Sequence, residues 1–399
     1  MRSIANISFR GAAIAALLFV SCVSGGHGTD PNKTNPDWGW RSAGLTASGI
    51  DVSNNAGYQA ILHVGKRIFV MDARTLQGNQ ACRIFSSKQG TETWDSLNIP
   101  NGLVPNAWIA DSPYVYVGMS SKGAIWRYNV NNSTWDDLKT GADSIYSVSG
   151  FGHFNGGVIA SLASSQTAMR PILYYKDSSW INLNQSAQFP DDASFLSGIE
   201  YHGTFYAATY DTGVWAWTPS DSMWRKLQNP VSPYDTTIHD RKFPRSMAVL
   251  NDSLYMGYYS NGGIQKLVNG NSWVRMDSCI TYMYNGSPQY SCGAPSNAYT
   301  MAIWNNHLIA SGDWSSIPVV YMAPSQPKGW ALLGGDTWKG GMNSTFDMTV
   351  VGDTLYTASW NAVWKFPLSQ LDSSVKAYPA YPGYPSSSSA ATTKKTIHP

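Results

Sequence analysis

A short phrase built around tryptophan returns along most of this chain at near-constant spacing. It consists of a small residue, a Trp, two further residues and usually a Leu. Its copies are TWDSL at 93, TWDDL at 134, SWINL at 179, MWRKL at 223, SWVRM at 272 and GWALL at 329. The Trp residues of successive copies are 41, 45, 44, 49 and 57 positions apart. Self-similarity at a period of about 40 to 50 residues is typical of a β-propeller or another solenoid.

Three strand-like segments precede each copy of the phrase. Examples of the first, more continuously apolar segment are AILHV at 60 and MAVL at 247; of the second, YVYVG at 114; and of the third, AIWRY at 124. Four short strands per repeat, counting the Trp strand, are what a propeller blade contains. We expect the apolar first strand to be innermost, with neighbouring blades pressing on both its faces. The Trp strand should form the outer edge, where the indole covers the gap between sheets and its N–H reaches a polar group.

The copies predict a closed ring of seven blades. Complete units begin near Gly57, Ala107, Val148, Phe195, Ser246 and Tyr299, and a seventh, from 345, stops after three strands. The segment DWGWRSAGL (37–45) supplies the missing Trp strand, so that Trp40 completes the last blade. Such closure hides the sheet edges that an open ring would expose. The predicted fold class is therefore all-β, a seven-bladed β-propeller of four-stranded blades over residues 37–371.

Both ends of the chain have their own character. Residues 1–21 predict a signal peptide. Arg2 and Arg10 form a positively charged start, and the ten-residue apolar run that follows is too short to span a membrane. The sequence FVSC resembles a bacterial lipoprotein signal, which predicts lipidated Cys22 as the mature N-terminus; the alternative is cleavage near Ser24 and a secreted product. Residues 22–36 are expected to be a flexible tether and residues 372–399 a disordered tail rich in Pro, Ser and Tyr. We therefore expect the domain to be exported. It would be either anchored in the cell envelope (outer membrane) by a lipid or secreted.

Composition narrows the class of partner. Charged residues make up 13% of the chain, about half of the ~25% usual for soluble proteins. The net charge is +2, and the sequence has no stripe of basic residues that would indicate binding of nucleic acid. We find no metal-ligand spacing and no GxSxG motif. We expect no cofactor, no bound metal and a monomer that touches the membrane only through its anchor.

The phrase YVYVGMSSKGAIWRYNVNNSTWDDL (114–138) resembles the blade pattern of secreted bacterial propellers, including kelch-like, sialidase-like and sensor-type ones. The resemblance spans residues 37–371 and implies an architecture rather than one family. The turns KDSSW, SDSMW and NGNSW are similar to the sialidase Asp-box turn without its full spacing. The arginine triad and Tyr–Glu pair of sialidases are not found, so the resemblance does not carry that activity.

Two of the four cysteines predict a cross-link. Cys279 and Cys292 lie thirteen residues apart in the loop-like stretch SCITYMYNGSPQYSC. In an exported protein this spacing favours a disulfide, which the chain-entropy model values at about 3 kcal/mol. Cys82, in ACRIF, is expected to be a buried strand residue.

The predicted connections are long on one face of the ring only. Loops that follow second and fourth strands include 228–245, 277–297, 311–317 and 333–345, whereas those after first strands are tiny. Long connections gathered on one face indicate that this face carries the binding or catalytic residues. Aromatic faces with a few polar anchors suit sugar rings; the alternative for each residue is loop packing. The candidate ligand-binding residues are Tyr210, Asp211, Arg245, Tyr259, Tyr282, Tyr284, Tyr290, Asp313, Trp314, Trp338 and Trp360.

Three functions stay open at this stage. The first is non-catalytic binding of an extracellular glycan or protein partner on the long-loop face. The second is a carbohydrate-active hydrolase or lyase, for which His239, Asp240 and Asp211 are the candidate acid and base groups, beside Arg241. The third is a scaffold within an envelope complex. Two close carboxylates with shifted pKa values would favour the enzyme, an aromatic patch the glycan, and a large apolar patch the protein partner.

Overall fold

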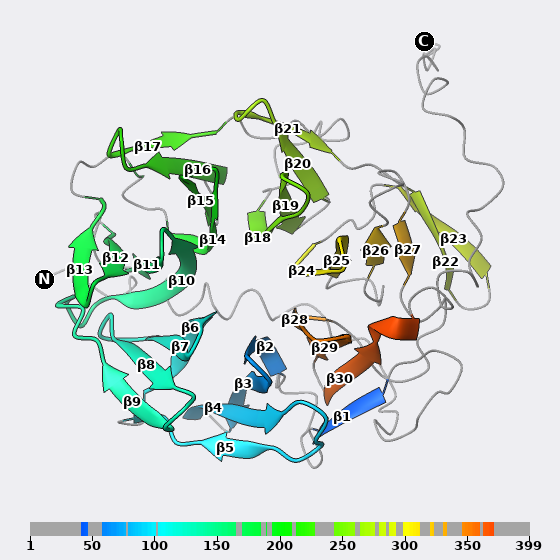
Figure 1. Ribbon diagram of the computed structural model, residues 1–399, viewed down its shortest axis with the longest axis horizontal. Helices are drawn as coiled ribbons and strands as arrows, with labels where there is room; N and C mark the ends of the chain where they lie inside the picture. The colour runs from blue at the N-terminus through cyan, green and yellow to red at the C-terminus, as the bar shows by residue number, and fades with distance from the viewer. Residues whose placement is uncertain are drawn as a thin grey trace, which may run out of the picture.

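The computed structural model describes residues 41–46, 58–76, 79–100, 103–164, 170–184, 189, 194–209, 213–227, 243–259, 264–275, 279–284, 287–292, 298–311, 320–322, 330–332, 345–359 and 362–370. These residues form β-strands, turns and irregular segments, with one short 3₁₀ helix, η3 (Leu368–Gln370). The sheets stand around a common centre, and within each unit the first strand lies nearest the axis (Figure 1).

Four of the sheets hold consecutive antiparallel strands in chain order. One contains β2 (Tyr58–Val64), β3 (Arg67–Leu76), β4 (Asn79–Lys88) and β5 (Asp95–Leu97). The next contains β6 (Pro105–Asp111), β7 (Tyr114–Met119), β8 (Ile125–Asn129) and β9 (Thr134–Asp137). A third contains β18 (Phe243–Val249), β19 (Leu254–Tyr259), β20 (Ile264–Val268) and β21 (Ser272–Arg275). The fourth contains β24 (Thr300–Trp304), β25 (His307–Ser311), β26 (Val320–Met322) and β27 (Trp330–Leu332).

An eight-stranded sheet consists of two such units joined at their innermost strands. The first unit contains β10 (Ser147–Phe154), β11 (Gly157–Ala163), β12 (Ile172–Lys176) and β13 (Ser179–Asn182). The second contains β14 (Phe195–Tyr201), β15 (Thr204–Thr209), β16 (Gly213–Thr218) and β17 (Met223–Lys226). β10 and β14 pair in parallel where Gly152 faces Gly198. A Cβ on Gly198 would lie 2.2 Å from Cζ of Phe205, so glycine is what lets the two strands meet over that ring.

A sheet of mixed origin brings the two ends of the described chain together. It contains β28 (Asp347–Val351), β29 (Thr354–Ala358), β30 (Ala362–Pro367) and β1 (Arg41–Thr46). β1 runs antiparallel to β30, with Arg41 opposite Lys365 and Ser42 opposite Trp364. This is the pairing that the predicted ring closure requires; Trp40 itself lies outside the described residues. A separate hairpin is formed by β22 (Cys279–Tyr284) and β23 (Ser287–Cys292).

The second strand of each unit carries the core. In β7, β11, β15, β25 and β29 nearly every side chain is buried, whereas most side chains of the first strands β6 and β14 are partly exposed. The first strands are innermost as predicted (Figure 1), and the side chains of the second strands are the more deeply buried. A second strand has sheet partners on both edges and neighbouring sheets on both faces, while a first strand leaves its axial edge without a partner in its own sheet.

Three of the repeated tryptophans bond from one unit to the next, as predicted, whereas the buried indole nitrogen of Trp273 has no hydrogen-bond partner among the described residues. The indole N–H of Trp94 donates to the carbonyl oxygen of Ala43 at 2.8 Å. Trp180 donates in the same way to Leu138 at 3.0 Å, and Trp224 to Leu183 at 3.3 Å. The structural role of these indoles is therefore confirmed at three positions.

The acceptor of each bond occupies the same place in the repeated phrase. Leu138 and Leu183 stand three residues after Trp135 and Trp180, and Ala43 stands three residues after Trp40. The amide of each leucine bonds within its own sheet, Leu138 to Ile125 O at 3.1 Å and Leu183 to Ile172 O at 2.7 Å. The phrase thus encodes a clasp: its Trp donates to the preceding unit and its Leu accepts from the following one. We call this the Trp–Leu clasp.

Candidate functional site

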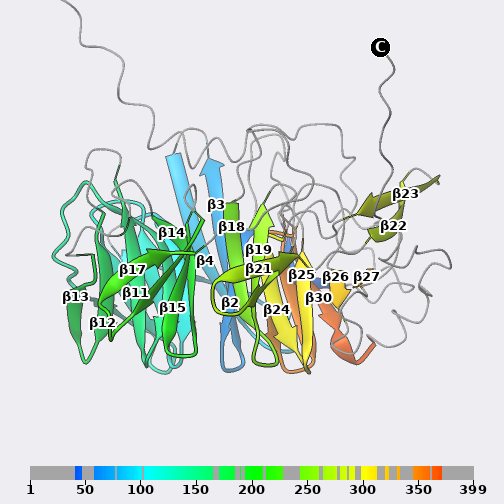
Figure 2. The same cartoon turned by 90° about the horizontal axis from the view of Figure 1, so that it is seen from above.

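The two ends of the ring are built differently. Connections from first to second strands are tight, with two residues between the strands at 65–66, 112–113, 155–156, 202–203, 305–306 and 352–353, and four at 250–253. These turns lie together at the lower end of the molecule in Figure 2. We call it the short-turn end, and the opposite one the long-loop end.

Polar contacts between neighbouring units occupy the short-turn end. The amide of Asn155 donates to Oε2 of Glu200 at 2.6 Å. His202 Nε2 lies 2.5 Å from Oδ1 of Asp252, and the indole of Trp304 donates to Asp353 at 3.3 Å. Each of these contacts joins adjacent units, at a turn or at the strand end beside one. The polar side chains of this end are thus largely engaged with one another.

Two described hairpins distinguish the long-loop end. β3 and β4 are ten residues long and rise beyond the neighbouring strands, and the β22–β23 hairpin lies on the same side (Figure 2). The stretch from Cys279 to Cys292, expected to be a loop, is a hairpin instead, because its register pairs the two segments throughout. That register sets Cys279 directly opposite Cys292. The disulfide stays a prediction, since their side chains lie outside the described part.

Hydrogen bonds run between first strands near the ends that face the long loops. Polar side chains there reach the backbone or side chain of the next unit's first strand. The bonds are Asn106 to Val148 O (2.6 Å), Ser149 to Phe195 O (3.1 Å), Ser246 to Ala298 O (3.1 Å) and Thr300 to Asp347 (2.8 Å). The backbone of several first strands shifts register here, between Pro105 and Ala107 and between Pro244 and Ser246 for example. Such bulges re-aim side chains. We call these ends of the first strands, with Asn106, Ser149, Ser246, Thr300 and Asp347, the axial rim; polar groups can be presented there.

Asp347 is the most connected member of the axial rim. Its Oδ1 accepts from the Thr300 hydroxyl at 2.8 Å and from its neighbour Met348 N–H at 2.9 Å, and its Oδ2 accepts from Ile61 N–H at 3.0 Å. Burial raises the pKa of Asp347 to about 6, although these bonds and the charge of Arg245 act to lower it. Both oxygens hold adjacent units together, so the carboxylate has a structural role.

Arg245 is the charged residue of the rim on β18. It occupies the register shift of that strand, and its guanidinium carbon lies 4.9 Å from the centre of the Tyr299 ring. Its charge also acts on Asp347, which belongs to the unit beyond that of Tyr299. The contact with Tyr299 joins the innermost strand β18 to the segment that leads into β24, the innermost strand of the next four-stranded sheet. Arg245 therefore lies at the axis, toward the long-loop end where the sequence predicted it.

The other predicted ligand-binding residues have no described side chains. Tyr259 lies on β19, Tyr282 and Tyr284 on β22 and Tyr290 on β23, described by backbone alone. The residues outside the described part are Cys22, Tyr210, Asp211, His239, Asp240, Arg241, Asp313, Trp314, Trp338 and Trp360. Thr300 and Asp347 were not singled out from the sequence. The signal that could have found Asp347 is a lone charge in the otherwise apolar inner strand DMTVV.

Two further kinds of feature, a metal site and a membrane-spanning helix, are absent from the described residues. No three His, Cys, Asp or Glu side chains among them gather closely enough to hold a metal ion. None of the described segments is a helix of the length and apolarity needed to cross a bilayer.

Comparison with known proteins identifies the fold. No protein-family model and no curated protein sequence matches the chain. Solved β-propellers do: the WD40 β-propeller domain of Doa1 is 16% identical, with a TM-score of 0.51, over 82% of this chain and 97% of that one. The extracellular domain of a one-component system from B. thetaiotaomicron is 11% identical with a TM-score of 0.55, over 82% of this chain. PorZ, a surface component of the type-IX secretion system of Porphyromonas gingivalis, is 13% identical with a TM-score of 0.56, over 79% of this chain.

These likenesses show a β-propeller fold, so the fold predicted from the repeat is confirmed at that level. The chain spans 39% of the length of the one-component-system domain and 48% of PorZ. At such low identities the likeness concerns architecture, and what the neighbours do remains a property of those proteins.

Proposed function

We propose that this chain is an exported, non-catalytic β-propeller that binds an extracellular ligand, a glycan or a protein partner, at its long-loop end. The carrying observation is the difference between the two ends of the ring. The short-turn end is closed by tight turns beside which described polar groups of adjacent units contact one another, whereas the longer connections lie at the opposite end. Loops held by a rigid scaffold are where propellers and other β-folds place their binding residues.

The proposal includes a ring of seven blades closed by β1. The parallel contact of β10 with β14 divides the eight-stranded sheet into two blades, which join the four consecutive sheets and the β28–β30 sheet. The β1–β30 pairing and the bond from Trp94 to Ala43 support closure, since they repeat the arrangement of the inner seams.

Export and a lipid anchor at Cys22 are part of the same proposal. The surface and extracellular origin of two structural neighbours, together with the apolar N-terminal run, supports export. Metabolic labelling with a palmitate analogue, compared between the wild type and Cys22→Ser, tests the anchor. Label that persists in the variant would remove it from the proposal.

The binding function is tested by screening the whole chain on a glycan array beside the double variant Trp314→Ala, Trp338→Ala. We expect specific binding that the double variant loses. Equal binding by both proteins would take the aromatic loops out of the site. Absence of binding to any glycan would transfer the proposal to a protein partner.

A protein partner is the second candidate, and one observation favours it. Ile181, Met223 and Val274 are each about half exposed and lie on the outer strands β13, β17 and β21. Apolar side chains on three outer edges in succession offer a lateral surface for a scaffold role in an envelope complex. Pull-down from envelope extracts with wild type and the triple Ser variant at these positions separates this surface from the long-loop end.

The hydrolase or lyase alternative has weaker support. A pair of carboxylates with separated pKa values is the usual mark of such a site, and Asp347 has a raised pKa but contacts hydroxyl and amide donors. Its residues Asp211, His239 and Asp240 lie outside the described part. Release of reducing ends from any glycan bound on the array would establish this alternative.

A further inference from the structure

Arg245 stands apart from the other polar residues of the axial rim because it is charged and unpaired. The equivalent register-shift positions hold Gln59, Asn106, Ser149 and Leu196, which are all neutral. Within the described residues, Arg245 makes the contact with the Tyr299 ring and neither an ion pair nor a hydrogen bond. A partly buried arginine without a counter-ion is uncommon, since its charge costs free energy unless it is compensated.

The neighbouring carboxylate does not serve as that counter-ion. Both oxygens of Asp347 are already engaged by Thr300, Ile61 and Met348. Arg245 acts on Asp347 through its charge alone. The five N–H donors of the guanidinium therefore remain available for another group.

The Tyr299 ring holds the guanidinium in place. The guanidinium carbon lies 4.9 Å from the ring centre, and Tyr299 is itself buried. An arginine fixed against an aromatic face loses less side-chain entropy when it binds, and its planar fork matches a carboxylate in two parallel hydrogen bonds. The arrangement is thus prepared for a planar anion that approaches along the axis from the long-loop end.

We infer that Arg245 binds the carboxylate of an acidic polysaccharide, a chain of uronic-acid type, at the axial mouth of the long-loop end. The inference rests on the proposed function and names the ligand class of that site. A narrow sugar chain can place one carboxylate at the axis, whereas a stable protein interface needs about 800 Å² on each partner. Ser246 and Thr300, the chain neighbours of Arg245 and Tyr299, carry the hydroxyls beside this pair that a sugar would meet.

Binding should be coupled to proton uptake. An anion at Arg245 cancels the attraction that now favours the charged form of Asp347, so the pKa of Asp347 rises further and protons are taken up near pH 6. Among the described groups packed around Asp347, β24 supplies the neutral Thr300 and β18 supplies Arg245. β2 supplies His63, which contacts Thr349 of the same strand β28. The variant Asp347→Asn removes this coupling and leaves His63 unchanged.

The test is calorimetric titration of the whole chain with oligogalacturonate and with the same oligosaccharide after carboxyl reduction. We expect Arg245→Gln to weaken binding of the acidic form about tenfold or more, and Arg245→Lys to recover part of it. The control Arg225→Gln, on exposed β17, should leave binding unchanged. Asp347→Asn should tighten binding and abolish the dependence of the heat on buffer ionisation enthalpy near pH 6.

The possible outcomes separate this inference from the proposed function. Binding of neutral glycans alone, unaffected by Arg245→Gln, would overturn the inference and leave the proposed function standing. Poly-glutamate binding in place of oligogalacturonate would overturn the assignment to a glycan. If no glycan binds, the anion site is tested by NMR, with acetate as the probe. The Arg245 Nε–Hε signal is assigned as the one that Arg245→Lys removes. A signal that acetate does not move rejects the anion site, and a signal that shifts supports it.

Discussion

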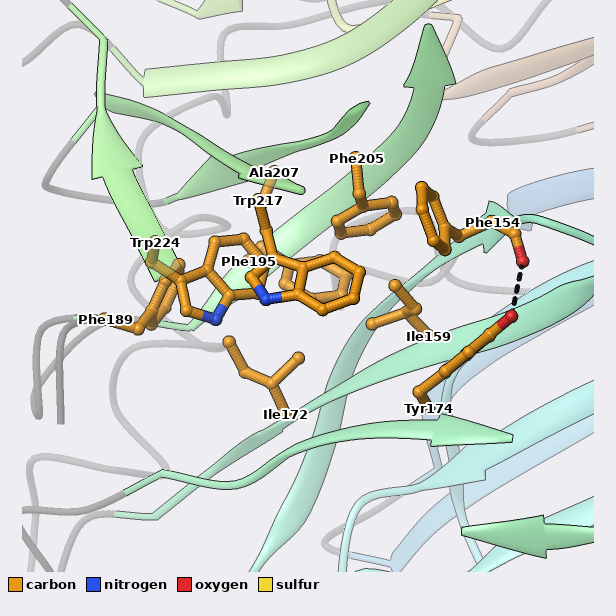
Figure 3. Packing of buried hydrophobic residues seen from close by; sticks show 10 residues of the cluster. All are labelled: Phe154, Ile159, Ile172, Tyr174, Phe189, Phe195, Phe205, Ala207, Trp217 and Trp224. Carbon is orange, nitrogen blue, oxygen red and sulfur yellow. Dashed lines mark hydrogen bonds between the residues drawn. The ribbon is translucent and has the colours of Figure 1, made fainter. Parts of the chain in front are cut away.

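Two seams between neighbouring sheets are sealed by different chemistry. The seam between the β10–β13 and β14–β17 units, which we call the aromatic seam, is filled by buried rings, among them Phe154, Phe205, Trp217 and Trp224 (Figure 3). The rings of Phe154 and Trp217 meet edge-on at 5.4 Å. The seam between the β2–β5 sheet and the sheet of β1 and β28–β30, the terminal seam, has smaller aliphatic residues such as Ile61 and Val351.

Polar links supplement the small core of the terminal seam. His63 bonds Thr349 at 2.7 Å, and the side-chain amide of Gln89 donates to Val351 O at 2.9 Å. The carboxylate of Asp347 and the Trp94 clasp add to them. Apolar burial is non-directional, whereas hydrogen bonds depend on register. Both seams contain directional bonds, so the difference lies in what accompanies them: a large cluster of buried rings in the aromatic seam, and a smaller aliphatic core with additional polar side-chain links in the terminal seam.

The largest effect is expected in the aromatic seam. Phe205→Ala removes a fully buried ring that contacts Phe154, Phe195 and Trp224, and should lower the free energy of unfolding by about 3–5 kcal/mol. Urea unfolding followed by tryptophan fluorescence measures it. The corresponding truncation in the terminal seam, Ile68→Ala, should cost less, about 2–3 kcal/mol. Equal losses would contradict the claim that the aromatic seam depends more on packing.

The terminal seam should respond to pH through Asp347. Because its pKa is raised to about 6 from an ordinary value of 3.8, the folded protein favours the protonated carboxyl. This contribution to stability is complete below about pH 4 and is lost as the pH rises through about 6, by about 2–3 kcal/mol. Burial lowers the pKa of His63, which acts in the opposite sense.

Comparison of wild type with Asp347→Asn isolates the aspartate contribution. Thermal unfolding from pH 4 to pH 7 should show a stability difference between the two proteins that changes across this window. Asn keeps an acceptor for Ile61 N–H and offers a donor to Thr300. Parallel profiles for the two proteins would show that the carboxyl does not titrate in the seam.

Removal of one clasp bond should have a smaller effect. Trp94→Phe keeps most of the ring area and deletes the donor to Ala43 O, which should cost about 1 kcal/mol. Amide exchange of β1 should speed up more than exchange of β20, because β1 is the strand that the bond holds. Trp224→Phe, whose bond to Leu183 is longer and lies beside the aromatic seam, is the internal control. A larger loss in Trp224→Phe would reverse the comparison.

The smallest effect is expected for the ion pair between Lys365 and Glu92. Nζ and Oε1 lie 2.7 Å apart, and the glutamate is mostly exposed. Lys365→Met should cost less than about 0.5 kcal/mol at moderate salt. Lys365 lowers the pKa of Glu92, so what stability the pair gives is present at neutral pH and lost as the pH falls through that lowered pKa. A loss above 1 kcal/mol would rank this pair with the clasp.

The sequence predicted the parts of the fold that repeat. Trp135, Trp180, Trp224 and Trp273 lie on outer strands as expected, because one spacing and one residue type recur in every unit. The deeper burial of the second strands was not predicted, since apolar content alone does not distinguish a strand with an axial edge from one enclosed on all sides. Arg245 was singled out because the sequence predicted it at the end of the connection 228–245; in the structure it lies on β18, and its stacking on Tyr299 joins residues of different units that no local pattern relates.

The Trp–Leu clasp has a consequence for where a polypeptide of this kind can begin. The bond from Trp94 to Ala43 uses the same two atoms, at the same phrase positions, as those made by Trp180 and Trp224. All three bonds span continuous chain, and the interruption lies instead between β30 and β1, which pair antiparallel as strands joined by a turn do. Circularly permuted genes that open at another outer-strand turn, such as 177–178, and join the present termini by a linker should encode the same ring, and natural relatives with shifted starting points are compatible with the same geometry.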